Sequence, residues 1–563
     1  MYAGGTTLDL TSSANPIATG QPVTFTATIN TQPSGNATGT VKFKNGTTIM
    51  GTVAVSGNSA SLTTTYGNAG TYFITATYSG NSFYEPSVSY ILGQVVQAAT
   101  TTTIASSQNP SQNGSPVIFT VTVASTGGTP TGTVQINIPG YYYQLPTLAL
   151  SAGSAQYTTS LLPVGNPVIT ASYLGNADFF PSTSPPLNQG VKFPSNFSVL
   201  YNFTGGNDGA SPQAGLSQDS QGNLYGTTYV GGSSSYGTVF KVSASRQETV
   251  LYTFTAANGD GAYPTARPIL DAQGNLYGTT EAGGDLNCGY FFGCGTVFKL
   301  SPAGSETVLH SFTNAGGDGA SPISGLVLDS PGNLYGSTEY GGAYGDGTVF
   351  ILIPSGQEAW VYDFAGGSDG YFPSGLTRPD SQGNLFGTTP SGGLENDCGT
   401  VFKVTSTGQK SVVYNFIGGP TDGCYPQGGV VRDSQDNLFG ATASGGTSYY
   451  DGTVYTLTAA GQETILYNST GPEDGSPNAR LVRDSQGNLY GTTLYGGVFG
   501  SGTIFKVAPN GQETTLYTFT GRGGVDGLYP EGALLVDSQG NLYGTTNSGG
   551  VNGSGMVFKL APQ

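Results

Sequence analysis

Charge is scarce in this sequence, and positive charge is scarcest. Only 9% of the 563 residues are charged, and 33 acidic residues against 16 lysines and arginines give a net charge of −17. A surface of this sign repels nucleic-acid phosphates and anionic lipid headgroups, so we expect no nucleic-acid partner. The same surface suits divalent cations or neutral polysaccharides.

Histidine and long apolar runs are also missing. The single histidine, His310, stands where other copies of a repeat described below have tyrosine, which argues against a Ser-His-Asp triad and against histidine metal ligation. No run of 18 apolar residues occurs, so we expect no membrane span. The segment MYAGGTTLDL has neither a basic stretch nor an apolar core. We therefore expect that a secretion leader is not part of this chain.

Glycine and aromatic residues, in contrast, are plentiful. The chain has 91 glycines, 35 tyrosines and 27 phenylalanines, and the glycines recur at fixed places. Apolar residues at the three- and four-residue spacing of a helix are almost absent. These features predict an all-β protein with many tight turns.

The first part of the chain contains one unit twice. TATYSGNSFYEPS (75–87) recurs as TASYLGNADFFPS (170–182), and short alternating strands separated by Gly, Asn and Pro turns fill each unit. This pattern predicts two β-sandwich domains, at 1–98 and 99–191. The units resemble bacterial immunoglobulin-like repeats, which implies a stalk or spacer. Ligand binding or self-association through these domains stays open.

The second part repeats the phrase Asn-Leu-Tyr/Phe-Gly seven times. The intervals are 52, 58, 51, 53, 51 and 53 residues, and each copy contains four strand-like pieces. The last copy lacks its fourth piece, whereas an extra one, FSVLYNF (197–203), precedes the first copy. We therefore predict a seven-bladed β-propeller at 197–563, closed by pairing of its two ends within the last blade.

The phrases GNLYGTT, GTVFKL, ETVLYTF and GGxDG also resemble the Gloeobacter/Verrucomicrobia ("GloVer") tandem-repeat family of bacterial exported proteins. The resemblance covers all seven copies. It implies an extracellular or cell-surface location but no particular activity.

Two series of aspartates recur in the copies. A GGxDG-like loop joins successive copies, and a second aspartate lies in the turn after each first strand. Each loop aspartate either caps its own turn or contributes to a calcium site. The turn aspartates are expected to be structural. The loop series is Asp208, Asp260, Asp318, Asp369, Asp422, Asp474 and Asp526, and the turn series is Asp219, Asp271, Asp329, Asp380, Asp433, Asp484 and Asp537.

Aromatic residues gather in the loops on the same predicted face as the first series. They either pack the loops together or hold a sugar, because rings stack on the C–H faces of sugars beside polar groups. The predicted ligand-binding residues are Tyr290, Phe291, Phe292, Tyr263, Phe372, Tyr425 and Tyr529. Further loop aromatics are Tyr236, Tyr340, Tyr344, Tyr371, Tyr449, Tyr450, Tyr495 and Phe499.

The four cysteines all lie in these loops. Cys288 and Cys294 bracket the longest loop, and Cys398 and Cys424 fall in loops of adjacent copies. Two disulfides are expected, with free thiols or zinc as alternatives; no C-x-x-C spacing supports zinc.

Three functions remain open. The leading interpretation is a non-catalytic, exported or surface-displayed adhesion protein whose head binds a glycan or an extracellular protein. The alternatives are a polysaccharide hydrolase or lyase that uses loop carboxylates, and a structural subunit of a fibre or surface layer. Arginines on or near the first strands (267, 378, 432, 480 and 483) either line a pocket for an anionic group or pair with Asp.

Overall fold

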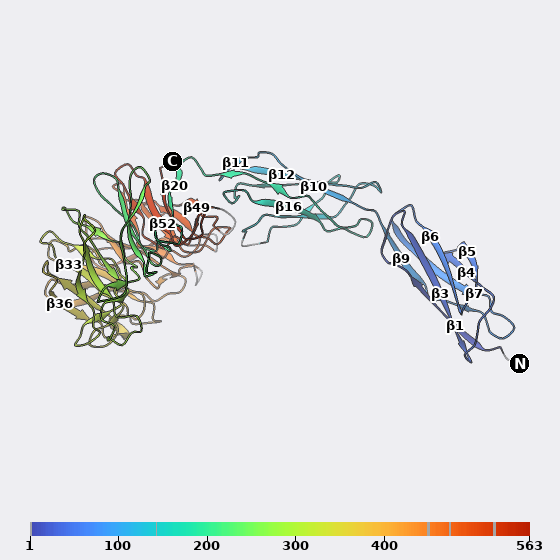
Figure 1. Ribbon diagram of the computed structural model, residues 1–563, viewed down its shortest axis with the longest axis horizontal. Helices are drawn as coiled ribbons and strands as arrows, with labels where there is room; N and C mark the ends of the chain where they lie inside the picture. The colour runs from blue at the N-terminus through green and yellow to red at the C-terminus, as the bar shows by residue number, and fades with distance from the viewer. Residues whose placement is uncertain (1–2, 142–143, 448–450, 472–473, 522–524, 563) are drawn as a thin grey trace.

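The computed structural model describes residues 3–141, 144–447, 451–471, 474–521 and 525–562. It is all-β, as expected; among the described residues the only helix is the short 3₁₀ turn η1 (Gly367–Asp369). No described helix is long and apolar enough to span a bilayer. The two N-terminal sandwiches lie one after the other beside the repeat region, which gives an elongated molecule (Figure 1).

The first sandwich is built from two sheets around one core, antiparallel except for the parallel pair β2 and β9. Phe25, Phe43, Ile74 and Tyr78 are fully buried in that core because alternate residues of each strand face inward. One sheet has the order β1 (Gly5–Ser12), β3 (Pro22–Gln32), β6 (Ser59–Thr65). The other has the order β2 (Ile17–Ala18), β9 (Leu92–Gln97), β7 (Gly70–Tyr78), β4 (Thr40–Asn45), β5 (Thr48–Ala54), with β8 (Ser87–Val88) beside β7.

The second sandwich repeats this plan. Its strands are β10 (Thr101–Ser106), β12 (Val117–Ala124) and β15 (Ser154–Thr159) in one sheet. The facing sheet has β14 (Leu148–Ala149), β13 (Thr133–Asn137), β16 (Val168–Tyr173) and β17 (Ser182–Thr183), with β18 (Leu187–Asn188) beside β16. The short strands β11 (Ser111–Gln112) and β19 (Val191–Lys192) pair in parallel.

The segment repeated between the two sandwiches has the same function in both. Tyr78 donates its hydroxyl to the carbonyl of Thr38 at 2.7 Å, and Tyr173 donates to Thr131 at the same distance. The side chain of Asn81 accepts the backbone N–H of Phe83, as Asn176 does from Asp178. The shared sequence therefore encodes one tyrosine anchor and one capped turn.

The repeat region consists of seven sheets, numbered here along the chain. Six have four strands, ordered from first to fourth. Sheet 1 is β21 (Ser217–Gln218), β22 (Leu224–Thr228), β23 (Thr238–Val242), β24 (Glu248–Thr253). Sheet 2 is β26 (Ile269–Leu270), β27 (Leu276–Thr280), β29 (Thr296–Leu300), β30 (Glu306–Ser311). Sheet 3 is β32 (Val327–Leu328), β33 (Leu334–Thr338), β35 (Thr348–Leu352), β36 (Glu358–Asp363). Sheet 4 is β37 (Leu385–Thr389), β38 (Thr400–Val404), β39 (Lys410–Asn415). Sheet 5 is β41 (Val430–Arg432), β42 (Leu438–Thr442), β44 (Thr453–Leu457), β45 (Glu463–Asn468). Sheet 6 is β46 (Val482–Arg483), β47 (Leu489–Thr493), β48 (Thr503–Val507), β49 (Glu513–Thr518). Sheet 7 is β51 (Leu535–Val536), β52 (Leu542–Thr546), β54 (Met556–Leu560), β20 (Phe197–Asn202).

Loops on one side of these sheets carry four further two-stranded ribbons. They are β25 (Gly261–Ala262) with β28 (Ala282–Gly283), β31 (Gly319–Ala320) with β34 (Tyr340–Gly341), β40 (Gly423–Cys424) with β43 (Ser444–Gly445), and β50 (Gly527–Leu528) with β53 (Ser548–Gly549).

The predicted strand pairing between the two ends of this region is present. β20 runs antiparallel to β54, with Phe197 opposite Leu560 and Asn202 opposite Met556. In contrast, the expected first strand of the fourth copy is missing from sheet 4, where Thr377 keeps one backbone bond to Phe386. Pro379 stands where sheet 1 has Gln218, and proline has no N–H to donate to a ladder.

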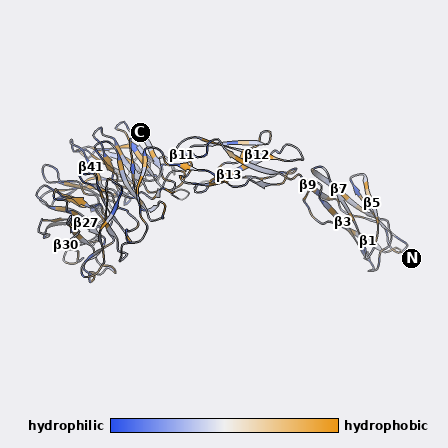
Figure 2. Ribbon diagram, turned by 45° about the horizontal axis from the view of Figure 1, so that its top comes forward, coloured by the Kyte–Doolittle hydropathy of each residue, from blue (hydrophilic) through white to orange (hydrophobic). Residues whose placement is uncertain are grey.

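Successive sheets share hydrophobic cores in one recurring arrangement. A β-branched residue of the third strand packs against the Leu and the aromatic residue of the next sheet. Sheet 7 and sheet 1 pack in the same way, with Val557 against Leu224 and Phe240. The other pairs are Val239 with Leu276 and Phe298, Val297 with Leu334 and Phe350, Val349 with Leu385 and Phe402, Val401 with Leu438 and Tyr455, Val454 with Leu489 and Phe505, and Ile504 with Leu542 and Phe558. Figure 2 accordingly shows short apolar segments on strands in all parts of the chain.

The glycine of the Asn-Leu-Tyr/Phe-Gly phrase makes room for these aromatic rings. A Cβ at Gly226 would lie 2.5 Å from the ring of Phe240, and one at Gly544 would lie 2.5 Å from the ring of Phe558. Both approaches are closer than carbon atoms tolerate. The phrase is thus a packing signature of the second strand.

Candidate functional site

Each aspartate of the loop series accepts hydrogen bonds from its own loop. Asp474, for example, accepts the hydroxyl of Tyr467 at 2.8 Å and both the N–H and the hydroxyl of Thr470 at 2.8 and 2.7 Å. All seven accept a backbone N–H four to six residues upstream, from Thr204, Thr255, Thr313, Ala365, Ile417, Thr470 and Thr520. The turn-capping alternative is therefore confirmed.

Calcium binding by these aspartates stays a prediction. In the part of the chain that the structure describes, no group of three or more His, Cys, Asp or Glu side chains lies close enough together to hold a metal ion.

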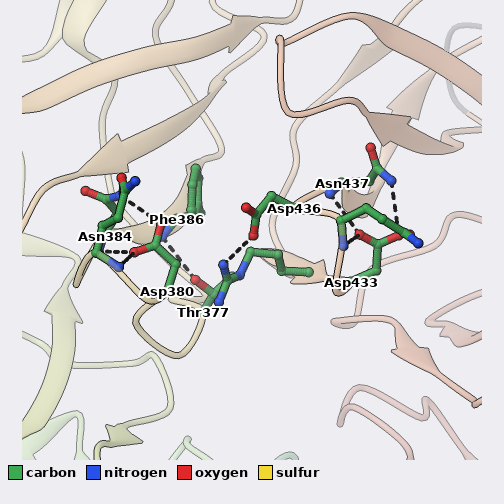
Figure 3. Close-up of polar contacts among 10 residues, drawn as sticks. Thr377, Asp380, Asn384, Phe386, Asp433, Asp436 and Asn437 are labelled. Atoms are coloured by element: carbon green, nitrogen blue, oxygen red, sulfur yellow. Dashed lines mark hydrogen bonds and ion pairs between the residues drawn. The ribbon is translucent and has the colours of Figure 1, made fainter.

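The turn aspartates also act locally. Asp380 accepts the side-chain amide of Asn384 at 2.7 Å, and Asp433 accepts that of Asn437 at 3.1 Å (Figure 3). The same pairing occurs at Asp219, Asp271, Asp329, Asp484 and Asp537. Because the asparagine is the first residue of the repeated phrase, the phrase encodes this turn together with the strand that follows. The structural interpretation of this series is confirmed.

A glutamate from the next sheet lies beside several loop aspartates. Burial and the charge of Asp208 raise the pKa of Glu248 to about 7. Burial and the charge of the neighbouring aspartate likewise raise the pKa of Glu306, beside Asp260, and of Glu463, beside Asp422, to about 7. One protonated and one ionised carboxyl is an arrangement that glycosidases use. Here the arrangement recurs from copy to copy, and these residues do not line the cavity described below. Such recurrence favours a structural role.

Both expected disulfides are present, and the structure contains no free cysteine. Cys288–Cys294 closes the longest loop of sheet 2, and Cys398–Cys424 ties the loop between β38 and β37 to the loop that leads into sheet 5. The first disulfide holds both ends of the segment that carries Tyr290, Phe291 and Phe292.

That segment joins two groups of aromatic rings, which together we call the aromatic arc. On one side, Phe292 lies 4.8 Å from Phe291 and 6.0 Å from Tyr263, measured between ring centroids. On the other side, Tyr290 lies 5.9 Å from Tyr340. The arc extends from Tyr263 to Tyr229 and Tyr236, and from Tyr340 to Phe372 and Tyr371.

The middle of the arc is the exposed part. The relative exposure is 91% for Phe291, 50% for Phe292 and 37% for Tyr290, and the neighbouring Leu286 is also exposed. Burial of these rings by a partner would release a large apolar surface from water. The arc thus contains the predicted residues Tyr290, Phe291, Phe292, Tyr263 and Phe372.

Two predicted residues lie outside the arc. Tyr425 packs against the core between sheets 4 and 5, and Tyr529 contacts Tyr495 at 5.4 Å. Among the further aromatics, Phe499 is buried against Tyr141 of the second sandwich, and Tyr449 and Tyr450 lie outside the described residues.

The backbone of the arc is held in a rare conformation. Tyr263 and Phe372 have φ values of 57° and 62°, in the left-handed region that bulky residues seldom adopt. Tyr263 bridges two sheets, because its N–H donates to Tyr236 and its carbonyl accepts from Glu281. Serine occupies the equivalent positions 211 and 321, so the turn itself does not require an aromatic side chain. This backbone conformation costs about 1–3 kcal/mol at each of the two aromatic residues.

Two carboxyl groups that the sequence reasoning missed lie beside the rings. Burial raises the pKa of Glu281, which pairs with the hydroxyl of Tyr229, and that of Glu339, which contacts Tyr340. Both follow the last Thr of the second strand, where other copies have Tyr, Pro, Ala, Leu or Asn. That departure from the repeat was the available signal. The arc therefore combines exposed rings with hydrogen-bonding groups.

Comparison with protein families supports the division of the chain seen in its sheets. The Gloeobacter/Verrucomicrobia repeat matches residues 189–396, 286–451 and 446–563. The bacterial Ig-like domain (group 3) matches residues 10–97 and 102–192. Among curated proteins, none matches this chain.

Solved structures give only distant likenesses. The extracellular domain of a putative hybrid two-component system from B. thetaiotaomicron is 10% identical, with a TM-score of 0.42 over 65% of this chain and 40% of that chain. That of a putative one-component system from the same organism is 12% identical, with a TM-score of 0.43 over 99% and 70%. A gluconolactonase from Xanthomonas campestris is 17% identical, with a TM-score of 0.33 over 54% and 86%. All three TM-scores are below 0.5, so we infer nothing about this chain from these likenesses. This chain spans less than half of the first protein.

Proposed function

Because the chain belongs to the Gloeobacter/Verrucomicrobia repeat family, we propose that it is an exported or cell-surface binding protein. Two immunoglobulin-like domains, at 1–98 and 99–191, act as spacers, and a seven-bladed β-propeller at 197–563 is the head. The head binds a glycan through the aromatic arc. Two disulfides support the location, since such bonds persist in oxidising compartments.

The closed propeller is supported by contacts between the two ends of the repeat region. β20 completes sheet 7, and the core that sheet 7 shares with sheet 1 repeats the arrangement of the other six. In addition, Thr545 of sheet 7 donates to the carbonyl of Ala214 at 2.9 Å. A ring leaves no sheet without a neighbour, whereas an open stack exposes the apolar faces of two end sheets.

A cross-link tests the meeting of the two ends. Ser198 lies opposite Lys559 across β20 and β54, so Ser198→Cys with Lys559→Cys should oxidise to an intramolecular disulfide. The pair Ser198→Cys with Lys506→Cys, at the equivalent position of sheet 6, is the control and should not. Intermolecular dimers or free thiols in the first pair would reject closure.

The spacer role is supported by the placement of the sandwiches. Each has its own core, and they extend one after the other away from the repeat region. The second sandwich contacts sheet 6 through Val164, whose N–H and C=O bond Thr520 and Val525. The arc, carried by sheets 1 to 4, is left open to solvent.

Glycan binding is supported most by the exposed rings on the disulfide-closed loop. A soluble protein gains nothing from exposing three adjacent rings on a constrained loop unless a partner covers them. Rings of this kind stack on sugar C–H faces, while Glu281 and Glu339 offer polar contacts to hydroxyl groups. Preorganisation by the disulfide lowers the entropic cost of binding.

A glycan array followed by calorimetry, with and without calcium, tests this function. The variants Phe291→Ala and Phe292→Ala should weaken binding at least tenfold, because each removes a stacking surface. Tyr90→Ala is the matched control, since Tyr90 of the first sandwich is 95% exposed. Binding that is absent, or equal in all variants, would reject the proposal. Binding to a protein but to no glycan would show that the ligand is not a glycan, while the aromatic arc would remain the proposed binding site.

A further inference from the structure

Residues in or just before the first strands of six sheets, together with the corresponding segment before sheet 4, surround one cavity of about 1120 Å³. Gly215, Gly325 and Ala533 line it at the position four residues before the turn aspartate. Arg267 and Arg480 occupy the same position in sheets 2 and 6. The small residues Gly215, Gly325 and Ala533 leave space for these two long side chains. In the fourth copy Arg378 lies two residues after the equivalent position and also lines the cavity.

Arginine is concentrated here against the trend of the whole chain. The sequence has seven arginines in a protein of net charge −17, and all except Arg246 and Arg522 line this cavity. Two of the five have acidic partners: Arg432 lies 2.6 Å from Asp436, and Arg483 lies 4.0 Å from Asp433. Arg267, Arg378 and Arg480 have no ion pair among the described residues.

Two of these three guanidinium groups, those of Arg267 and Arg480, are held by neutral partners. Arg267 donates from Nε to the hydroxyl of Ser217 at 3.1 Å. Arg480 donates to the carbonyls of Leu376 and Val430 at 3.2 and 3.1 Å, so it reaches from sheet 6 to sheets 4 and 5. Such contacts orient the groups but leave their charge uncompensated.

The three groups are close enough to affect one another. Burial and the charges of Arg267 and Arg378 lower the pKa of Arg480 to about 10, and burial with the charge of Arg378 lowers that of Arg267. Arginine side chains keep their charge at neutral pH in proteins. These three are nevertheless accessible, because Arg378 is exposed to the cavity and the other two are half-buried.

The carboxyl groups that line the cavity form no ion pair with these three arginines among the described residues. Asp329 accepts from Asn333 and Tyr335 in its own turn, and Glu531 accepts from Asn547 at 2.8 Å. Glu339 contacts Tyr340 in the arc, and burial raises its pKa, which favours the neutral form. Three like charges therefore face a cavity large enough for a small molecule.

We propose that this cavity binds a small oxyanion ligand, a molecule with two or more carboxylate, phosphate or sulfate groups, through Arg267, Arg378 and Arg480. Guanidinium groups bind such oxygens in a planar, two-bonded geometry, and an anion removes the repulsion among the three. The three arginines lie apart from the exposed rings of Tyr290, Phe291 and Phe292, although Phe372 and Glu339 beside the arc also line the cavity, and the proposal does not depend on glycan binding.

Titration of the full chain at constant ionic strength tests the site. The probes are citrate, inorganic phosphate, sulfate and digalacturonate, which separate polycarboxylate, phosphate, sulfate and acidic-sugar ligands; glucose and chloride are controls. We expect at least one probe to raise Tm in a saturable way. Equal shifts for chloride and every oxyanion would indicate screening only and would overturn the proposal.

Variants connect the effect to the cluster. Arg378→Gln should weaken binding of the effective probe at least tenfold and, without anion at low salt, should raise Tm because repulsion is relieved. Arg378→Lys keeps the charge and should bind the probe with an affinity between those of the parent protein and Arg378→Gln. Lys192→Gln on the second sandwich should bind it like the parent protein. Unchanged binding in Arg378→Gln, or a lower Tm without anion, would overturn the proposal.

Discussion

His310 Nε2 lies 3.2 Å from Asp318 Oδ1, at the position where other copies place a tyrosine hydroxyl against the loop aspartate. The only histidine of the chain is thus a variant of a structural contact. Although burial opposes it, the bond to Asp318 and the charge of that carboxyl raise the pKa of His310, and the same contact helps to lower the pKa of Asp318. The sequence interpretation of His310 as a variant of the tyrosine position agrees with this geometry.

Replacement of this histidine should change the pH dependence of stability. A raised histidine pKa means that its contribution is complete below pH 6.5, the unfolded value, and is lost as pH rises through the folded pKa. In His310→Tyr, the difference in unfolding free energy from the parent protein should therefore shift by about 1 kcal/mol between pH 6 and 9. Chemical denaturation across this range measures it. Tyr467→His, which faces Asp474, is the reciprocal control and should acquire the same dependence; parallel pH profiles for all three proteins would contradict the prediction.

Three glutamates should make the repeat region less stable as pH rises. The pKa values of Glu248, Glu306 and Glu463 are about 7, above the value of 4.5 for a free side chain. The folded state therefore binds more protons between these values, and stability falls as pH rises from about 4.5 to 7. The triple change to Gln should raise the unfolding free energy at pH 8 by about 1 kcal/mol per site, a discounted figure because the groups are partly exposed, and should have little effect at pH 5.

The copy with lysine provides the control for this experiment. Lys410 replaces the glutamate and contacts Asp369 at 2.7 Å. Lys410→Glu should therefore create one more carboxyl pair of this kind and lower Tm more at pH 8 than at pH 5. A triple variant that gains equally at both pH values would show that charge is not the cause.

Most of the architecture could be predicted from the sequence because the residues that determine the packing of each copy lie within that copy. The glycine beside Phe240 and the asparagine beside Asp219 recur in every copy, so the structure expected for one copy is expected for all seven. The missing first strand of sheet 4 was not predicted, although Pro379 is visible in the sequence. A two-residue strand has so few ladder bonds that one proline removes it.

The candidate site could be predicted only in part, because loops do not repeat their contacts. The disulfide and the exposed rings of Tyr290, Phe291 and Phe292 were predictable from an unusually long loop. That Tyr425 packs into a core while Tyr263 joins the arc depends on neighbours from other copies. The cluster of Arg267, Arg378 and Arg480 depends on which strand faces meet at one cavity. The alternation of side chains along a strand shows which residues share a face, but not which faces of different strands meet.

The two disulfides should differ in their effect on stability. Cys398–Cys424 encloses a separation of 26 residues and joins loops of two sheets, whereas Cys288–Cys294 encloses 6 within one loop. Loop-closure entropy grows with the enclosed length, so the change of Cys398 and Cys424 to Ala should cost about 3 kcal/mol and lower Tm. The same change at Cys288 and Cys294 should cost less but weaken binding by the arc. Equal losses of Tm in the two double variants would contradict the entropic argument.

The contact between the second sandwich and sheet 6 should determine whether these parts unfold together. The ring of Phe499 is 1% exposed and lies 5.0 Å from that of Tyr141, next to the backbone bonds of Val164. Phe499→Ala leaves a cavity there and should cost about 3 kcal/mol. Because the contacts of Phe499 and Val164 described above lie together at this junction, calorimetry should then separate one transition into two, and small-angle scattering should show a wider range of shapes. Tyr495→Ala in the same loop removes a ring that is 56% exposed and should leave the single transition intact. If Phe499→Ala also unfolds in one transition at an unchanged Tm, the second sandwich is joined to the head by other means.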